Sequence, residues 1–97
     1  MNIQALMKQA QSLQKDMMKA KEEIDNTIFT GSNSFVTVKV NGKKEVLDIK
    51  IDTDSVDKDD IEMLQDILMV ALNNAFSEVD KVTEQKMSKY ANIPGLF

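Results

Sequence analysis

The side chains that could do chemistry in this chain of 97 residues are of few kinds, because cysteine, histidine and arginine are all absent. Without cysteine and histidine, the chain cannot form disulfides, thiolate nucleophiles, zinc fingers or histidine acid–base groups. Every basic side chain is a lysine, a compact point charge that suits phosphate contacts better than the bidentate reading of a base. These residue types argue against an enzyme and favour a binding protein without a cofactor.

The lysines are distributed unevenly, although the net charge of the whole chain is −4. Residues 1–21 have a net charge of +3, residues 22–76 of −7 and residues 77–97 of zero. The charge of the whole chain is therefore a poor guide to its partners. Lysines at helical spacing usually form a solvated helix face, so the pattern alone is a weak indication of a phosphate-binding surface.

The acidic segment 52–60 resembles a calcium loop in composition, but its ligand spacing is wrong. Val56 and Asp57 occupy the third-ligand and glycine positions of such a loop, and Met63 stands where the bidentate glutamate belongs. We expect no metal site there. The acids instead suit a turn followed by a helix start, with Asp57 as the N-cap and further acids near the positive end of the helix dipole.

The elements that would position the lysines begin with a helix over residues 3–24. Its apolar residues recur in alternating steps of three and four, a heptad seam that predicts packing against another helix. A helix of roughly 24 residues spans about 36 Å, with Lys8 and Lys15 opposite the seam and a stop at Asp25-Asn26. The seam consists of Ile3, Leu6, Ala10, Leu13, Met17, Ala20 and Ile24.

From Thr27 the period changes to two, which predicts three antiparallel strands with one apolar face. The strands are expected over 27–30, 35–40 and 47–51, with residues 31–34 as the first loop. Asn41-Gly42 is typical of a tight hairpin between the last two strands. A hairpin loop of two or four residues would place the aliphatic residues of both strands on one face, whereas a three-residue loop would not.

A second, longer helix is predicted over residues 58–90, which contain neither proline nor glycine. At about 50 Å it is longer than strands of roughly 23 Å, so it must overhang the sheet. Because the number of strands is odd, the overhang should return beside the first helix and form an antiparallel arm with it. The expected fold class is α+β, with one domain over 1–91 and a flexible tail over 92–97.

The middle of the second helix is apolar on all sides, which predicts burial beyond the face that covers the sheet. A second copy of the chain would cover this surface and the open sheet edges, in an intertwined homodimer that presents two arms. No segment reaches the roughly 18 apolar residues of a membrane span and no signal peptide is evident, so an intracellular protein without a membrane partner is expected. The expected interface residues are Ile67, Leu68, Val70, Ala71 and Leu72.

Several short motifs follow one another along nearly the whole chain. They are Met7-Lys8-Gln9-Ala10-Gln11, Val38-Lys39-Val40-Asn41-Gly42, Ile49-Lys50-Ile51-Asp52, Ala71-Leu72-Asn73-Asn74-Ala75, Lys86-Met87 and Pro94-Gly95-Leu96-Phe97. In this order they resemble the YbaB/EbfC family of bacterial nucleoid-associated proteins, although Lys44 stands where a second hairpin glycine is common. The resemblance implies a homodimer with tweezer-like helical arms, which binds DNA in the cytoplasm, at the nucleoid, with little or broad sequence preference.

The leading hypothesis is therefore non-catalytic binding of duplex DNA, in which lysines on the arms neutralise phosphates and the acidic body stays off the duplex. The scattered aromatic residues argue against a single-strand-binding platform. The alternative is a protein-interaction or chaperone-like adaptor, which would hold a peptide between the arms or on the apolar tail. No small-molecule substrate is expected. The predicted DNA contacts are Lys8, Lys15, Lys19, Lys86 and Lys89, with Lys81 weaker because Asp80 and Glu84 flank it.

Overall fold

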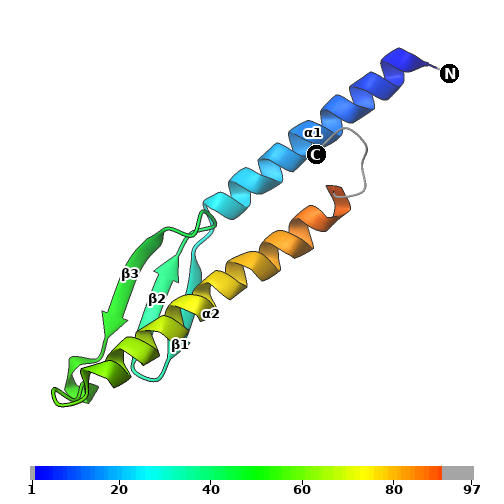
Figure 1. Cartoon of the computed structure of the whole chain (residues 1–97). Helices are drawn as coiled ribbons and strands as arrows, with labels where there is room; N and C mark the ends of the chain where they lie inside the picture. Colours follow the sequence, from blue (N-terminus) through cyan, green and yellow to red (C-terminus); the bar gives the residue numbers. More distant parts are fainter. Residues whose placement is uncertain (1, 91–97) are drawn as a thin grey trace.

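The computed structural model describes residues 2–90 and has the predicted order of elements, α-β-β-β-α. The elements are α1 (Ile3–Asp25), β1 (Phe29–Asn33), β2 (Val36–Val40), β3 (Val46–Ile51), the 3-10 turn η1 (Thr53–Ser55), α2 (Ile61–Met87) and the 3-10 turn η2 (Ser88–Tyr90). The molecule is elongated, with principal extents of 72 × 19 × 13 Å (Figure 1). The predicted tail, 92–97, lies outside the described residues.

Helix α1 begins and ends where local hydrogen bonds satisfy its free backbone groups. At its start, Asn2 Oδ1 accepts a hydrogen bond from the Ala5 N–H at 3.2 Å. At its end, the Asn26 N–H donates to the Glu22 carbonyl at 3.1 Å and the Thr27 N–H to the Ile24 carbonyl at 3.0 Å. The stop predicted at Asp25-Asn26 is confirmed.

The sheet has the order β1-β2-β3, and its neighbouring strands are antiparallel. Val36, Val38 and Val40 of the central strand are fully buried, as their alternation predicts. The predicted bounds of the first strand were wrong. Residues 31–33 belong to β1, and the turn lies at Ser34, whose φ is 51°. Gly31 was assigned to the loop because glycine is common in turns. In the structure it lies in β1 beneath α2, where the absence of a side chain lets the helix approach the strand closely.

The β2–β3 hairpin combines a three-residue loop with a bulge. The Asn41 N–H donates to the Glu45 carbonyl, and the Lys44 N–H to the Asn41 carbonyl, each at 3.0 Å, which leaves residues 42–44 as the loop. The strand pairs that follow are Val40–Val46, Lys39–Asp48, Val38–Ile49 and Val36–Ile51. Leu47 is the additional, unpaired residue, and it shifts the register by one. The later aliphatic residues of β3 therefore share the face of the buried valines despite the loop length.

Helix α2 begins later than predicted, because Asp60 rather than Asp57 caps it. Asp60 Oδ1 accepts from the Met63 N–H at 3.1 Å, whereas Asp57 Oδ1 accepts from the Asp59 N–H at 2.9 Å in the preceding turn. The helix is 27 residues long, which corresponds to about 40 Å. This length still exceeds that of the strands, so α2 overhangs the sheet as expected.

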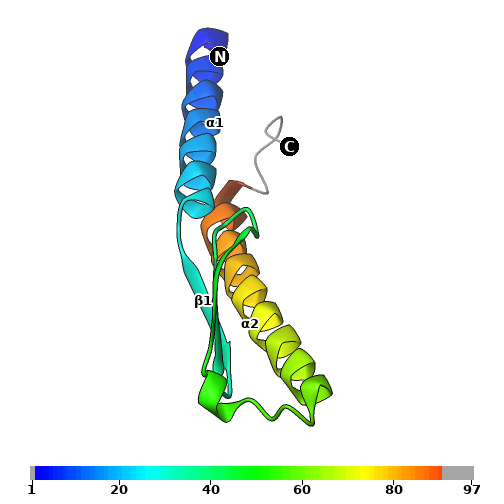
Figure 2. The same ribbon diagram turned by 90° about the vertical axis from the view of Figure 1, so that its left-hand side faces the viewer.

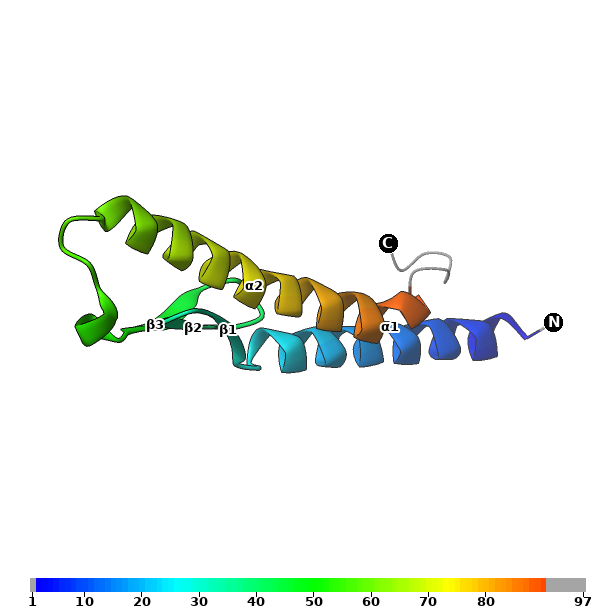
Figure 3. The same ribbon diagram turned by 90° about the horizontal axis from the view of Figure 1, so that it is seen from below.

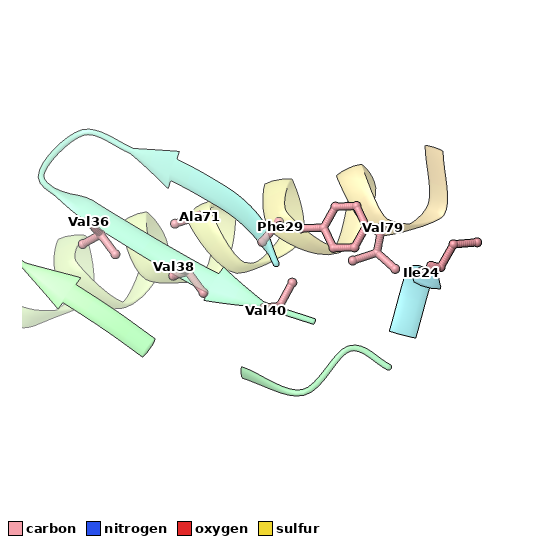
Figure 4. Close-up of a cluster of buried hydrophobic side chains, with 8 residues drawn as sticks. Ile24, Phe29, Val36, Val38, Val40, Ala71 and Val79 are labelled. Atoms are coloured by element: carbon pink, nitrogen blue, oxygen red, sulfur yellow. The ribbon is translucent and has the colours of Figure 1, made fainter. Parts of the chain in front are cut away.

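The core lies between α2 and the strands β1 and β2 (Figure 4). Ala71 and Ala75 of α2 are fully buried, and a Cβ atom on Gly31 would collide with their backbones. Small residues on both sides thus allow helix and strand to approach closely. At the far end of β1, Asn74 Nδ2 donates to the Ser32 carbonyl at 3.1 Å and holds this edge of the helix to the strand.

Beyond the sheet, the second half of α2 runs antiparallel to α1 and forms the predicted arm (Figures 1 and 3). Figure 2 shows the sheet continuing the line of α1, with α2 against both. The covered part of the α1 seam comprises Leu13, Met17 and Ala20, which are half-buried, and Ile24, which is buried. Helix α1 extends past the end of α2, so the first part of its seam is exposed.

Candidate nucleic-acid interface

Three of the predicted contact lysines lie along α1 and are exposed: Lys8, Lys15 and Lys19. Lys8 and Lys15 are two helical turns apart, about 10 Å along the axis. They lie opposite the seam, so they point away from α2. This part of the arm can therefore present a row of ammonium groups to a partner without disturbing its own packing.

The other three predicted lysines lie near the end of α2. Lys81 and Lys86 belong to the helix, Lys89 belongs to η2, and all three are exposed. The Lys89 Nζ lies 5.1 Å from the centre of the Tyr90 ring, within the range of a cation–π contact. Tyr90 itself is only 3% exposed and is buried at the end of the described part of the arm. The sequence pattern did not reveal this structural role.

Within residues 2–90, one side-chain ion pair is present, and it involves none of the six predicted lysines. Lys44 Nζ lies 2.8 Å from Asp80 Oδ1, linking the β2–β3 hairpin to α2. The hairpin thus lies at the base of the arm, where Gly42 also meets the end of α1. Asp80 and Glu84 were the two acids expected to weaken a DNA contact by Lys81. The carboxylate of Asp80 is paired with Lys44.

The acidic residues gather at the opposite end of the molecule from the arm. The segment 52–62, between β3 and the first turn of α2, contains six acids and one lysine. Asp52 and Asp57 each accept a backbone N–H in turns of this segment, and Asp60, instead of the predicted Asp57, caps α2 by accepting the Met63 N–H. The described residues contain no group of three or more acidic side chains placed to hold a metal ion.

The residues predicted for a dimer interface do not all lie on one surface. Val70 is 45% exposed, while Ile67, Leu68 and Leu72 are half-buried. Ala71 is fully buried in the core of its own chain, so it offers no surface to a second copy. A larger apolar surface lies on β3, where Val46, Leu47 and Ile49 are 45%, 52% and 43% exposed.

This β3 surface exists because α2 covers β1 and β2 and leaves the third strand open. Met69 of α2 is also exposed, at 55%, and its position on the helix indicates that it faces the β3 side. Met69 lies about three helical turns before Asp80 on the same stripe of α2, and Asp80 is paired with the β2–β3 hairpin. We define the open face as Val46, Leu47, Ile49 and Met69. The sequence predicted apolar residues on β3 but not that the helix would leave them uncovered.

No helix among residues 2–90 is long and apolar enough to cross a membrane. A model of the YbaB/EbfC DNA-binding family matches residues 1–93. A nucleoid-associated protein of Ligilactobacillus salivarius is 46% identical over 99% of this chain and 95% of its own length. One from Clostridium novyi is 47% identical over 100% of this chain and 90% of its own length.

The fold is also similar to a solved structure. The crystal structure of an uncharacterized protein from Helicobacter pylori superposes with a TM-score of 0.75 at 26% identity, covering 93% of this chain and 97% of that one. The family match, the two relatives and the shared fold all extend over nearly the full length of the sequence. The chain belongs to the YbaB/EbfC DNA-binding family.

Proposed function

We propose that this protein is a non-catalytic, nucleoid-associated protein of the bacterial cytoplasm that binds duplex DNA through lysines on its arm. The observation that best supports this function is the separation of charge along the molecule. Residues 2–21, at the arm end, contain four lysines and one aspartate, whereas segment 52–62 at the other end contains six acids. A duplex would be attracted to one end and repelled from the other, despite the net charge of −4.

The chemistry of lysine determines what kind of binding this arm can provide. Each ammonium group can neutralise one phosphate and release condensed counterions, which gives affinity without reading sequence. Without arginine, the chain lacks the side chain most often used to recognise guanine edges. Binding should therefore have little or broad sequence preference, with Lys8, Lys15, Lys19, Lys86 and Lys89 as main contacts and Lys81 as a weaker one.

We further propose that two copies associate through the open face and the adjoining outer surface of α2, including Val70. Val46, Leu47 and Ile49 belong to β3, an edge strand, which by itself is prone to pair with another chain. A two-fold dimer would cover the apolar surfaces of both copies and present two arms. Two linked arms would bind more tightly than one because the second contact becomes intramolecular.

A salt titration of the unaltered protein tests the DNA-binding proposal. Fluorescence anisotropy would follow binding to two labelled duplexes of equal length and different sequence, at several salt concentrations. We expect the affinity to fall steeply with salt and to be similar for the two duplexes. Binding that does not change with salt, or no binding at low salt, would contradict the proposal and favour the protein-interaction adaptor.

A further inference from the structure

The outer end of α1 is a single helix that no other described element accompanies. Within residues 2–90, every residue from 3 to 12 is exposed, and Leu13 is the first half-buried residue of the helix. Figure 3 shows α1 running past the end of α2 at this end of the molecule. We call residues 3–12 the bare tip. It is about 15 Å long and, with its side chains, about 10–12 Å across.

The polar side chains of this part of α1 are mostly amides. Four of the six glutamines of the chain lie within its first 14 residues, and the first acidic side chain is Asp16. Two glutamines and two lysines follow one another in steps of four, three and four, so they form one stripe on the side of α1 away from the seam. The stripe consists of Gln4, Lys8, Gln11 and Lys15, all of which are exposed.

Given the proposed binding of duplex DNA, on which this step rests, we infer that the bare tip lies in the major groove of the bound duplex. The major groove is about 12 Å wide and admits one α-helix, whereas the minor groove, about 6 Å wide, does not. From Leu13 onward α1 and α2 lie side by side and together measure about 20 Å across, which is too wide for either groove. The end of α2 therefore stays outside the groove, at the level of the phosphates.

The stripe carries groups suited to both the base edges and the backbone of the duplex. A glutamine amide has a donor and an acceptor, and every base pair presents hydrogen-bonding groups in the major groove. Gln4 and Gln11 can therefore bond base edges without requiring one sequence, which agrees with a broad preference. Lys8 and Lys15 are longer and charged, so they can reach the phosphates that border the groove. The absence of acids before Asp16 avoids repulsion from those phosphates.

Two pairs of glutamines test which face of α1 meets the bases. Gln4→Ala/Gln11→Ala should weaken binding to a labelled duplex roughly tenfold and leave the salt slope unchanged, because hydrogen bonds are lost but no phosphate contact is. Gln9→Ala/Gln14→Ala is the matched control, since both side chains are exposed but lie off the stripe, and it should bind like the unaltered protein. Equal affinities of the two variants would overturn the inference.

A duplex with an obstructed major groove separates the position of the tip from DNA binding itself. Glucosylated 5-hydroxymethylcytosine places a sugar in the major groove and leaves the phosphates unchanged, because the C5 position of a pyrimidine faces that groove. The unaltered protein should bind this duplex about tenfold more weakly, or less, than the unmodified duplex of the same sequence. Equal, salt-dependent binding to both would overturn the groove assignment and leave DNA binding intact. No binding to the unmodified duplex would overturn both.

Discussion

Gly31 and Gly42 each lie where the backbone of another element passes within contact distance. At Gly31 this element is α2, and at Gly42 it is the end of α1, near Ile24. The sequence identified Gly42 as a hairpin residue, but the residue with positive φ in that hairpin is Lys44, at 62°. Local pattern reveals that a turn occurs, whereas close contact between distant backbones depends on tertiary packing and leaves no local signal.

Replacing Gly31 by alanine should destabilise the fold. The added Cβ would collide with the backbone of Ala71 and Ala75, which cannot move as a flexible side-chain end would. We expect a loss of about 1–3 kcal/mol in the free energy of unfolding, measured by denaturant titration. The exposed neighbour Ser32→Ala is the control and should change stability by less than about 0.5 kcal/mol. Equal stability of the two variants would contradict the close packing of α2 on β1.

Among the elements, those with a long periodic pattern were predicted best. The seam fixed the length of α1, and the alternating valines identified β2, because both patterns repeat over several turns or residue pairs. The start of α2 was predicted at the wrong residue because Asp57 and Asp60 can both accept a backbone N–H, and only the path of the connector decides between them. The bulge at Leu47 likewise has no marker in the sequence.

The arm predicts a graded series of alanine variants on α1. Ile24→Ala should cost about 2–5 kcal/mol because this side chain is only 3% exposed. Leu13→Ala, at a half-buried position, should cost about 1–2 kcal/mol. Met18→Ala, at a position 63% exposed, is the control and should cost less than about 0.5 kcal/mol. Denaturant unfolding measures all three, and a different order would contradict the packing of α1 against α2.

For the whole molecule, the odd number of strands was the decisive feature. It places the acidic connector at one end and the arm at the other, which the structure confirms (Figure 1). The separation of the predicted lysines from the acids could therefore be derived from element order and charge. The open face could not, because amphipathic patterns do not specify which strands a helix covers.

The proposed dimer predicts that Val70→Glu reduces association without unfolding the chain. Val70 is exposed in the single chain, so a glutamate there remains solvated in a monomer but would lose water at an interface. Light scattering should show a dimer for the unaltered protein and a weakened or absent dimer for the variant, with unchanged helix content by circular dichroism. The control Gln85→Glu, also exposed and on the same helix but about four turns away in the arm, should remain dimeric. A monomeric unaltered protein at micromolar concentration would exclude the proposed dimer.

The position of the DNA-binding surface is the central claim, and the chain offers two exposed lysine pairs to compare. One pair is Lys8 and Lys15 on the arm, and the other is Lys39 and Lys50 on the outer face of the sheet. Lys43 and Lys44 are a poorer control, because their hairpin lies at the base of the arm and Lys44 is paired with Asp80. Replacing either chosen pair by alanine removes the same charge.

The most direct measurement is therefore the affinity of both double-alanine variants for one labelled duplex across a range of salt concentrations. The account predicts that Lys8→Ala/Lys15→Ala weakens binding to every duplex alike and lowers the salt slope by about two, one for each lost phosphate contact. Lys39→Ala/Lys50→Ala should bind nearly like the unaltered protein. Loss of binding in the sheet variant, with binding retained in the arm variant, would contradict the assignment of DNA binding to the arm.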